Sequence, residues 1–128
     1  MPDLSPNFSP NFSLVILYVD NPMASAAFYE DLLGLAPVEV APTFAMFRLP
    51  SGIGIGFWSR HTVEPAATAA GGGGELAFTA DDVDAVHADW AAKGLPVAQP
   101  PTELDFGRTF VALDPDGHRL RVFAPAGP

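Results

Sequence analysis

The sequence predicts an α+β fold in which two βαβββ modules form a curved mixed sheet with helices on its convex side. A strand, a helix and three further strands can be traced twice along the 128 residues. Residues 61–74, which end in four glycines, separate the two passes and are typical of a linker. When the halves are aligned, Ser51-Gly52 falls over Asp116-Gly117, as expected for an internal repeat.

The first module is expected at about residues 13–60. Residues 14–19, LVILYV, are apolar on both faces, which predicts a strand that is buried on both sides. Pro22 suits the first turn of a helix, and Gly34 is placed to end that helix. Its apolar face is expected to carry Ala24, Phe28 and Leu32.

Three strands are expected to complete this module, at residues 36–41, 43–49 and 53–59. The last of them has an unusual alternation. Ile53, Ile55 and Phe57 form one apolar face, while the other face carries Gly54, Gly56 and Trp58. Glycine inside a strand costs roughly 0.5–1 kcal/mol relative to alanine, so we expect the glycines to leave room for something on their face of the sheet.

The second module is expected at about residues 75–125. ELAFTA at 75–80 is strand-like, and the following stretch at 81–94 reads as a capped helix that Gly94 ends. Its apolar face is expected to carry Val83, Val86 and Trp90. Further strands are expected at residues 96–99, 108–113 and 118–124, and DPDG at 114–117 is expected to turn the chain between the last two.

The composition limits the possible functions. Six basic and fifteen acidic residues give a net charge of -9, which disfavours nucleic acid and anionic membranes as partners. The chain has no cysteine, so disulfides and zinc-thiolate sites are excluded. No apolar run approaches the ~20 residues of a spanning helix. We therefore expect a single soluble domain over residues 1–128, located in the cytoplasm.

Two motifs carry a family resemblance: NPMASAAFYEDLLG at 21–34, directly after the first strand, and FGRTFVALDPDGHRLRV at 106–122, near the end of the chain. With them, residues 13–125 resemble the vicinal oxygen chelate superfamily, which contains glyoxalase I, extradiol dioxygenases and bleomycin resistance proteins. Together with PVEVAPTFAMF and GFWS, the chain looks most like the phenazine-antibiotic resistance proteins, which bind aromatic antibiotics without transforming them. The resemblance implies a homodimer with pockets at the subunit interface.

Enzymes of this superfamily hold a divalent metal with four side chains, and the resemblance places those positions on Leu14, Gly56, Glu75 and Arg121. Only Glu75 among them is a metal-ligand type, whereas a divalent ion needs several oxygen or nitrogen donors at ~2 Å. We therefore expect no metal, no other cofactor and no catalytic residue, and metal-assisted chemistry is disfavoured.

The predicted function is non-covalent binding of a small planar aromatic compound, in the manner of a protein that sequesters an antibiotic. Trp58 is expected to stack on the ligand, beside Gly54 and Gly56. Strand parity places further side chains on the same hollow face, namely Phe44, Met46, Ile16, Tyr18 and Arg121, and the resemblance adds Glu75. Phe106 and Arg108, at the entry to the seventh strand, are expected either to close the rim of the pocket or to pack in an ordinary turn.

Other interpretations remain open at this point. Trp58 could be ordinary core packing, and Glu75 and Arg121 could simply pair with each other. A metal-dependent lyase or dioxygenase, or a small-ligand sensor, would fit the same fold. The three histidines have no convincing partner in the sequence, so a solvated or structural role is expected for each.

Overall fold

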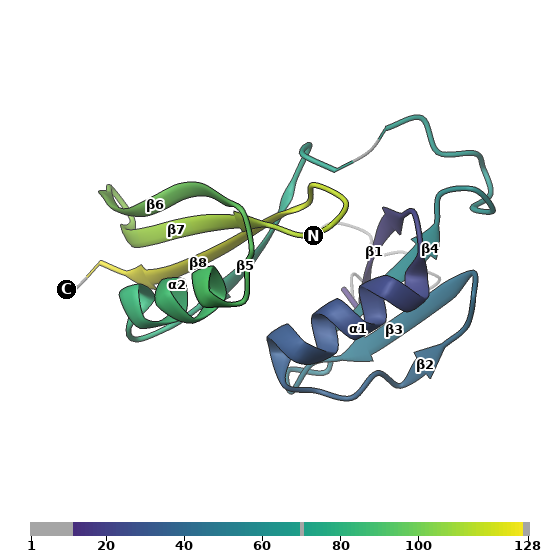
Figure 1. The fold of residues 1–128 in the computed structure, drawn as a ribbon, viewed down its shortest axis with the longest axis horizontal. Helices are drawn as coiled ribbons and strands as arrows, with labels where there is room; N and C mark the ends of the chain where they lie inside the picture. The colour runs from purple at the N-terminus through teal and green to yellow at the C-terminus, as the bar shows by residue number, and fades with distance from the viewer. Residues whose placement is uncertain (1–11, 70, 127–128) are drawn as a thin grey trace, which may run out of the picture. The chain divides into compact units, whose positions relative to one another are not determined.

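The computed structural model describes residues 12–69 and 71–126 and confirms two βαβββ modules (Figure 1). By its internal contacts the chain forms two compact units. Among the described residues, the first unit contains residues 12–17 and 21–58, and the second contains residues 18–20, 59–69 and 71–126. No helix in the described part of the chain has the length and apolar character needed to cross a membrane.

The first module forms a four-stranded sheet in the order β1-β4-β3-β2 and carries one helix. One hydrogen-bonded turn and one helix cap help to shape it. Gly52 N donates to Leu49 O at 2.8 Å in the turn before β4, and Asn21 caps the helix N-terminus by accepting from the amides of its first turn. The elements are β1 Leu14–Val19, α1 Pro22–Leu33, β2 Glu39–Val40, β3 Phe44–Arg48 and β4 Gly54–Ser59.

The core of the first module lies between α1 and one face of the sheet. Tyr29 of α1 is fully buried and stacks on Phe57, with ring centroids 4.5 Å apart. Phe47 meets Phe57 edge to face at 6.1 Å, and Ile55 is buried beside them. This packing confirms that Ile55 and Phe57 face the core, which fixes the register of β4.

Two expectations for this module were wrong in detail. The buried side chains of α1 are Pro22, Ser25, Ala26 and Tyr29, whereas Ala24 is exposed, so the helix is rotated relative to the expected apolar face. Strand β1 is covered on one face only, because α1 packs on a single side of the sheet. Its apolar composition therefore reflects something other than burial within the module.

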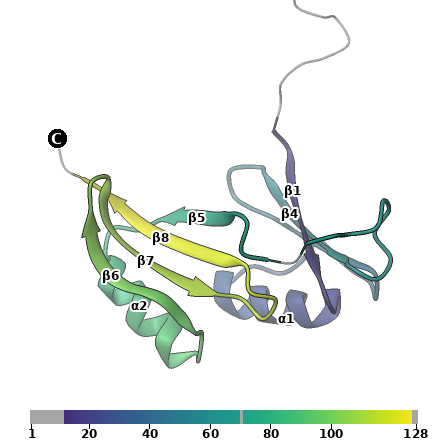
Figure 2. The same ribbon diagram turned by 90° about the horizontal axis from the view of Figure 1, so that it is seen from above.

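The second module forms a sheet in the order β5-β8-β7-β6, in which β5 and β8 are parallel and the other neighbours are antiparallel. Helix α2 packs on one face of this sheet (Figure 2), where Trp90 and His87 contact the buried ring of Phe110 edge to face. Leu120 and Val122 complete this core. The elements are β5 Glu75–Thr79, α2 Val83–Ala92, β6 Val97–Leu104, β7 Gly107–Leu113 and β8 Arg119–Pro125.

Strand β6 is longer than the expected residues 96–99, because it continues through Pro100 and Pro101 to Leu104. Proline lacks the amide that a sheet ladder needs, and its presence normally argues against a strand. Here β6 is the edge of its sheet, and its pairing with β7 shifts register between Gln99 and Thr102. An irregular edge strand can accommodate both prolines.

Candidate ligand-binding faces

The sheet face opposite α1 carries the glycines, as predicted. In the antiparallel pairing of β3 with β4, Phe44 lies opposite Trp58, Met46 opposite Gly56, and Arg48 opposite Gly54. Cross-strand partners point to the same side of a sheet, so these side chains share one surface with Trp58. We call this surface the glycine face and define it by Phe44, Met46, Arg48, Gly54, Gly56, Trp58 and the outward residues Leu14 and Ile16 of β1.

The space over the glycines is already filled by side chains of the chain itself. A Cβ atom on Gly56 would lie 2.8 Å from Cζ of Phe44 and 3.6 Å from Cγ1 of Ile16. A Cβ atom on Gly54 would lie 3.0 Å from Cδ1 of Leu14. The expected open gap beside Trp58 is therefore absent from this conformation, because the ring of Phe44 leans diagonally across the strands and covers Gly56.

The glycine face is apolar although much of it is exposed. Leu14, Ile16 and Tyr18, the outward residues of β1, expose 37%, 39% and 39% of their surface. Trp58 and Phe44 are half-buried and meet at right angles, with ring centroids 6.3 Å apart. Large adjacent apolar side chains left in water are typical of a surface that binds something.

In the second unit, Glu75 and Arg121 form the ion pair that the sequence left as one alternative. Nε of Arg121 donates to Oε1 of Glu75 at 2.5 Å, and Nη2 donates to Oε2 at 3.3 Å. The side chains are 18% exposed for Arg121 and 32% for Glu75. They lie on the sheet face away from α2. Side chains alternate along β8, and the two neighbours of Arg121, Leu120 and Val122, are buried on the side that α2 covers.

Two further residues hold the Arg121 guanidinium. Its Nη1 donates to the buried Thr109 hydroxyl at 3.1 Å, and Thr109 in turn donates to the carbonyl of Val122. Its Cζ lies 5.8 Å from the centre of the Phe106 ring, a distance suited to a cation–π contact. Thr109 was not among the residues predicted from the sequence, although it lies opposite Phe123 in the pairing of β7 with β8, which places it on this face.

Loss of one partner of this ion pair should cost more than loss of both. Glu75→Gln leaves a partly buried guanidinium without its counter-charge, and we expect the free energy of unfolding to fall by about 1–3 kcal/mol. Adding Arg121→Met should recover part of that loss. Urea unfolding of Glu75→Gln, Arg121→Met and the double variant measures the coupling free energy between the two side chains. Strictly additive losses of stability would contradict a stabilising ion pair between Glu75 and Arg121.

These residues do not suit the divalent metal that the superfamily's enzymes carry. The corresponding positions hold Leu14 and Gly56, which offer no donor side chain, and Glu75, whose two oxygens accept from Arg121. Within residues 12–69 and 71–126, no three His, Cys, Asp or Glu side chains converge into a metal-binding group. We therefore derive no chemical step through a metal.

Arg108 does not lie where the sequence analysis expected a pocket rim. It pairs across the sheet with Ala124, on the side covered by α2, and binds Asp84 of that helix through Nε at 2.7 Å and Nη2 at 2.8 Å. The hydrogen bonds from Arg108 hold the pKa of Asp84 below its ordinary value. Arg108 therefore links α2 to the sheet through its ion pair with Asp84.

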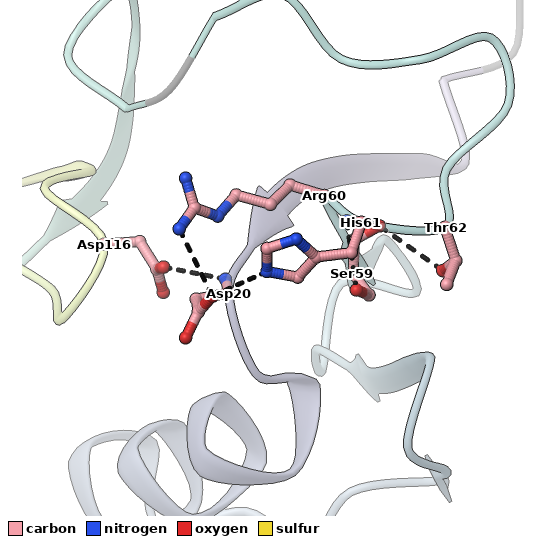
Figure 3. Close-up of polar contacts among 6 residues, drawn as sticks. All are labelled: Asp20, Ser59, Arg60, His61, Thr62 and Asp116. Carbon is pink, nitrogen blue, oxygen red and sulfur yellow. Dashed lines mark hydrogen bonds and ion pairs between the residues drawn. The ribbon is translucent and has the colours of Figure 1, made fainter.

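A polar cluster in the second unit was missed by the sequence analysis. Asp20 accepts from Nε2 of His61 at 2.7 Å and from Nη2 of Arg60 at 3.2 Å, while its backbone amide donates to Asp116 at 2.9 Å (Figure 3). Both hydrogen bonds lower the pKa of Asp20, and the one from His61 has the larger effect. Tyr18 lines a small surface hollow beside this cluster.

The other two histidines also have neighbours. Nε2 of His118 lies 3.1 Å from the carbonyl oxygen of Tyr18, and the His87 ring packs edge-on against Phe110. The DPDG turn is confirmed, since Gly117 N donates to Asp114 O and the Asp114 carboxylate accepts from the amides of Asp116 and His118. All three histidines have structural contacts, as expected, but the partners of His61 and His118 were not predicted.

Comparison with known proteins identifies related sequences. A sequence model of the Glyoxalase/Bleomycin resistance protein/Dioxygenase superfamily matches residues 11–122. The phenazine antibiotic resistance protein EhpR of Enterobacter agglomerans is 34% identical over 129 residues, which span 95% of this chain and 97% of that protein.

Solved structures show the same fold. The solution structure of protein ATC0852 from Agrobacterium tumefaciens is 56% identical, with a TM-score of 0.82 over 89% of this chain and 96% of that one. A glyoxalase-related enzyme from Fulvimarina pelagi has a TM-score of 0.79 over 93% of this chain and 94% of that one, at 22% identity. The second similarity concerns the fold alone, since its sequence identity is low.

Proposed function

Because the chain belongs to the glyoxalase/bleomycin resistance protein/dioxygenase superfamily, we propose that it binds a small planar aromatic compound of the phenazine type without converting it. The observation that carries this proposal is the glycine face, where apolar side chains are partly exposed around an indole and a phenyl ring. A flat aromatic molecule is the partner that such a surface suits best.

Trp58 would provide the stacking surface. Phe44, Met46 and Ile16 would form its apolar surroundings, with Tyr18 further along β1. Gly54 and Gly56 add no side chain of their own, so their neighbours can adjust to a flat guest; Met46 is suited to this because its thioether chain is flexible. For the second unit, contact of Phe106 and of the Glu75–Arg121 pair with a ligand stays a prediction from the sequence.

The proposal is supported by the relative that confers resistance to phenazine antibiotics and by the unsuitability of Leu14 and Gly56 as metal ligands. Protection by binding alone requires protein in at least the amount of the toxin and a low dissociation constant, because the protein does not turn over.

We further propose that the chain forms a homodimer, which sedimentation at several protein concentrations can test.

Equilibrium dialysis tests the proposed function. Purified protein should bind phenazine and phenazine-1-carboxylate saturably at one site per chain, and each compound should be recovered unchanged after long incubation. The protein should carry no stoichiometric divalent metal, and EDTA should not change the binding. Chemical conversion of the phenazine would contradict sequestration, and binding that EDTA abolishes would favour a metal-dependent enzyme. Absence of binding would refute the proposal.

A further inference from the structure

We infer that Arg48 binds an anionic substituent of the ligand, so that the natural ligand is a planar aromatic anion such as a carboxylate. Arg48 thereby adds a chemical class to the ligand of the proposed function, on which this inference rests. Arg48, the two glycines and Trp58 all belong to the first unit and to the glycine face. The proposed contact therefore lies within one compact unit.

Arg48 lies at the end of the glycine face away from Trp58. In the pairing of β3 with β4, Arg48 is opposite Gly54, and Trp58 is four residues further along β4, about 13 Å away along the strand. On the other side of β4, Cδ1 of Leu14 lies 3.0 Å from where a Cβ atom of Gly54 would be. Gly54 thus has the aliphatic Leu14 on one side and the cationic Arg48 on the other.

The two glycines give the ligand a direction along β4. At Gly54 and Gly56 this strand presents only hydrogen atoms to the glycine face, while side chains of β1 and β3 stand on either side. The Phe44 ring now covers Gly56, so binding requires this ring to move aside. A flat ring system that takes its place has one end against Trp58 and the other towards Gly54, where a substituent comes beside Arg48.

The Arg48 guanidinium has donors to spare. Its Nη1 donates to the carbonyl oxygen of Gly52 at 2.9 Å, and within residues 12–69 and 71–126 this is the one hydrogen bond or ion pair of its side chain. A guanidinium has five N–H donors, so enough remain to bind both oxygens of a carboxylate. The side chain is exposed, which leaves it open to a ligand. Its bond to Gly52 also reduces the side-chain entropy that binding would cost.

Arg48 also has no counter-charge to give up. Among the described residues of the first unit it is the only lysine or arginine, and its partner is a neutral carbonyl. An arginine that already binds a carboxylate would leave that carboxylate unpaired if it turned to a ligand. Three arginines of the second unit are in this position: Arg60, Arg108 and Arg121.

Glu39 is the acidic side chain against which this site must be weighed. It lies opposite Met46 in the pairing of β2 with β3, so it points to the glycine face as well. Strand β2 is one strand further from β4 than β3 is, which puts Glu39 about 4.8 Å further from the glycines across the sheet. Arg48, in contrast, is the direct neighbour of Gly54. An anion over Gly54 is therefore attracted by Arg48 more strongly than it is repelled by Glu39.

A matched pair of probes tests the inference. Phenazine-1-carboxylate and phenazine-1-carboxamide share the ring system, but only the first is charged at neutral pH. The unaltered protein should bind the carboxylate more tightly, on the order of fivefold at low salt, and this preference should shrink as salt is raised. Arg48→Gln should remove the preference and leave the affinity for the carboxamide unchanged. Arg48→Lys should retain part of it, because it keeps the charge without the planar fork. Calorimetric titration gives the affinities.

Two further variants control for the charge of the protein. Arg60→Gln makes the same change at an arginine that already binds Asp20, and it should keep the preference. Glu39→Gln removes a negative charge from the glycine face and should widen the preference. Equal affinities for the two probes in the unaltered protein, or a preference that survives in Arg48→Gln, would overturn the role of Arg48 while leaving the proposed function standing. Failure of both probes to bind would refute the proposed function itself.

Discussion

Replacing Trp58 by alanine is expected to weaken phenazine binding on the order of 30-fold, or about 2 kcal/mol. The indole provides the largest aromatic surface of the glycine face, and its loss would remove both buried area and stacking. The fold should survive, because Trp58 is half-buried and the core side of β4 is formed by Ile55 and Phe57. Calorimetric titration of the two proteins measures the difference.

Trp90→Phe is the control for this substitution. Trp90 is buried on α2 against Phe110, on the opposite side of its sheet from Arg119 and Arg121. Its replacement should lower stability modestly and leave phenazine affinity unchanged. If Trp58→Ala bound phenazine within twofold of the unaltered protein, the stacking role of Trp58 would be wrong.

Gly107→Ala is expected to reduce the free energy of unfolding by about 3 kcal/mol or more, lowering the Tm by roughly 10 °C. A Cβ atom at this position would lie 2.0 Å from the carbonyl oxygen of Ala124 and 2.8 Å from the amide of Ala126. The backbone φ of +138° is also unfavourable for any residue with a side chain. The substitution would force β7 and β8 apart where Gly107 lies opposite Pro125.

Gly117→Ala separates the two causes. Gly117 also has a positive φ, of +82°, yet a Cβ atom there would meet nothing within 4 Å. It should cost only the conformational strain, about 1–2 kcal/mol. Thermal and urea unfolding of both variants give the comparison. Equal losses for the two substitutions would contradict the close approach at Gly107.

The register of β4 could be predicted because its alternation is unambiguous. Placing Gly54 and Gly56 with Trp58, and Ile55 with Phe57, allows only one arrangement that buries the larger apolar face. The C-terminal end of α1 was predictable for a similar reason, since Gly34 suits a helix end and occupies it here. For the N-cap the sequence offered both Asp20 and Asn21, and Asn21 is the residue that caps the helix. Local rules determine such features.

Features that depend on the surrounding structure were harder to predict. An apolar strand such as β1 looks the same in sequence whether one or both faces are covered, and only the packing of α1 on a single face of the sheet leaves Leu14 and Ile16 partly exposed. The prolines concealed the full length of β6, because an edge strand tolerates what an inner strand does not. Strand composition alone does not give sheet position.

The rotamers of side chains and the contacts between residues far apart in the chain could not be predicted from the sequence. Alternation placed Phe44 on the glycine face but did not reveal that its ring covers Gly56, since this depends on its rotamer. Asp20 and His61 are 41 residues apart in the sequence. They meet because Asp20 follows the end of β1, His61 lies just beyond the end of β4, and these two neighbouring strands end side by side, where Arg60 N donates to Val19 O. Pairing the ends of β1 and β4 would have been the signal for this contact.

Isotope-filtered nuclear Overhauser spectroscopy of the labelled protein with phenazine-1-carboxylate tests the central claim most directly. It reports which protein protons lie close to the aromatic protons of the ligand. We expect contacts from the ligand to the methyl groups of Leu14, Ile16 and Met46 and to the indole of Trp58, all on the glycine face. Saturable binding with no contacts to these four side chains, or with contacts only to sheet residues packed beneath α1 such as Ile55, would contradict the account.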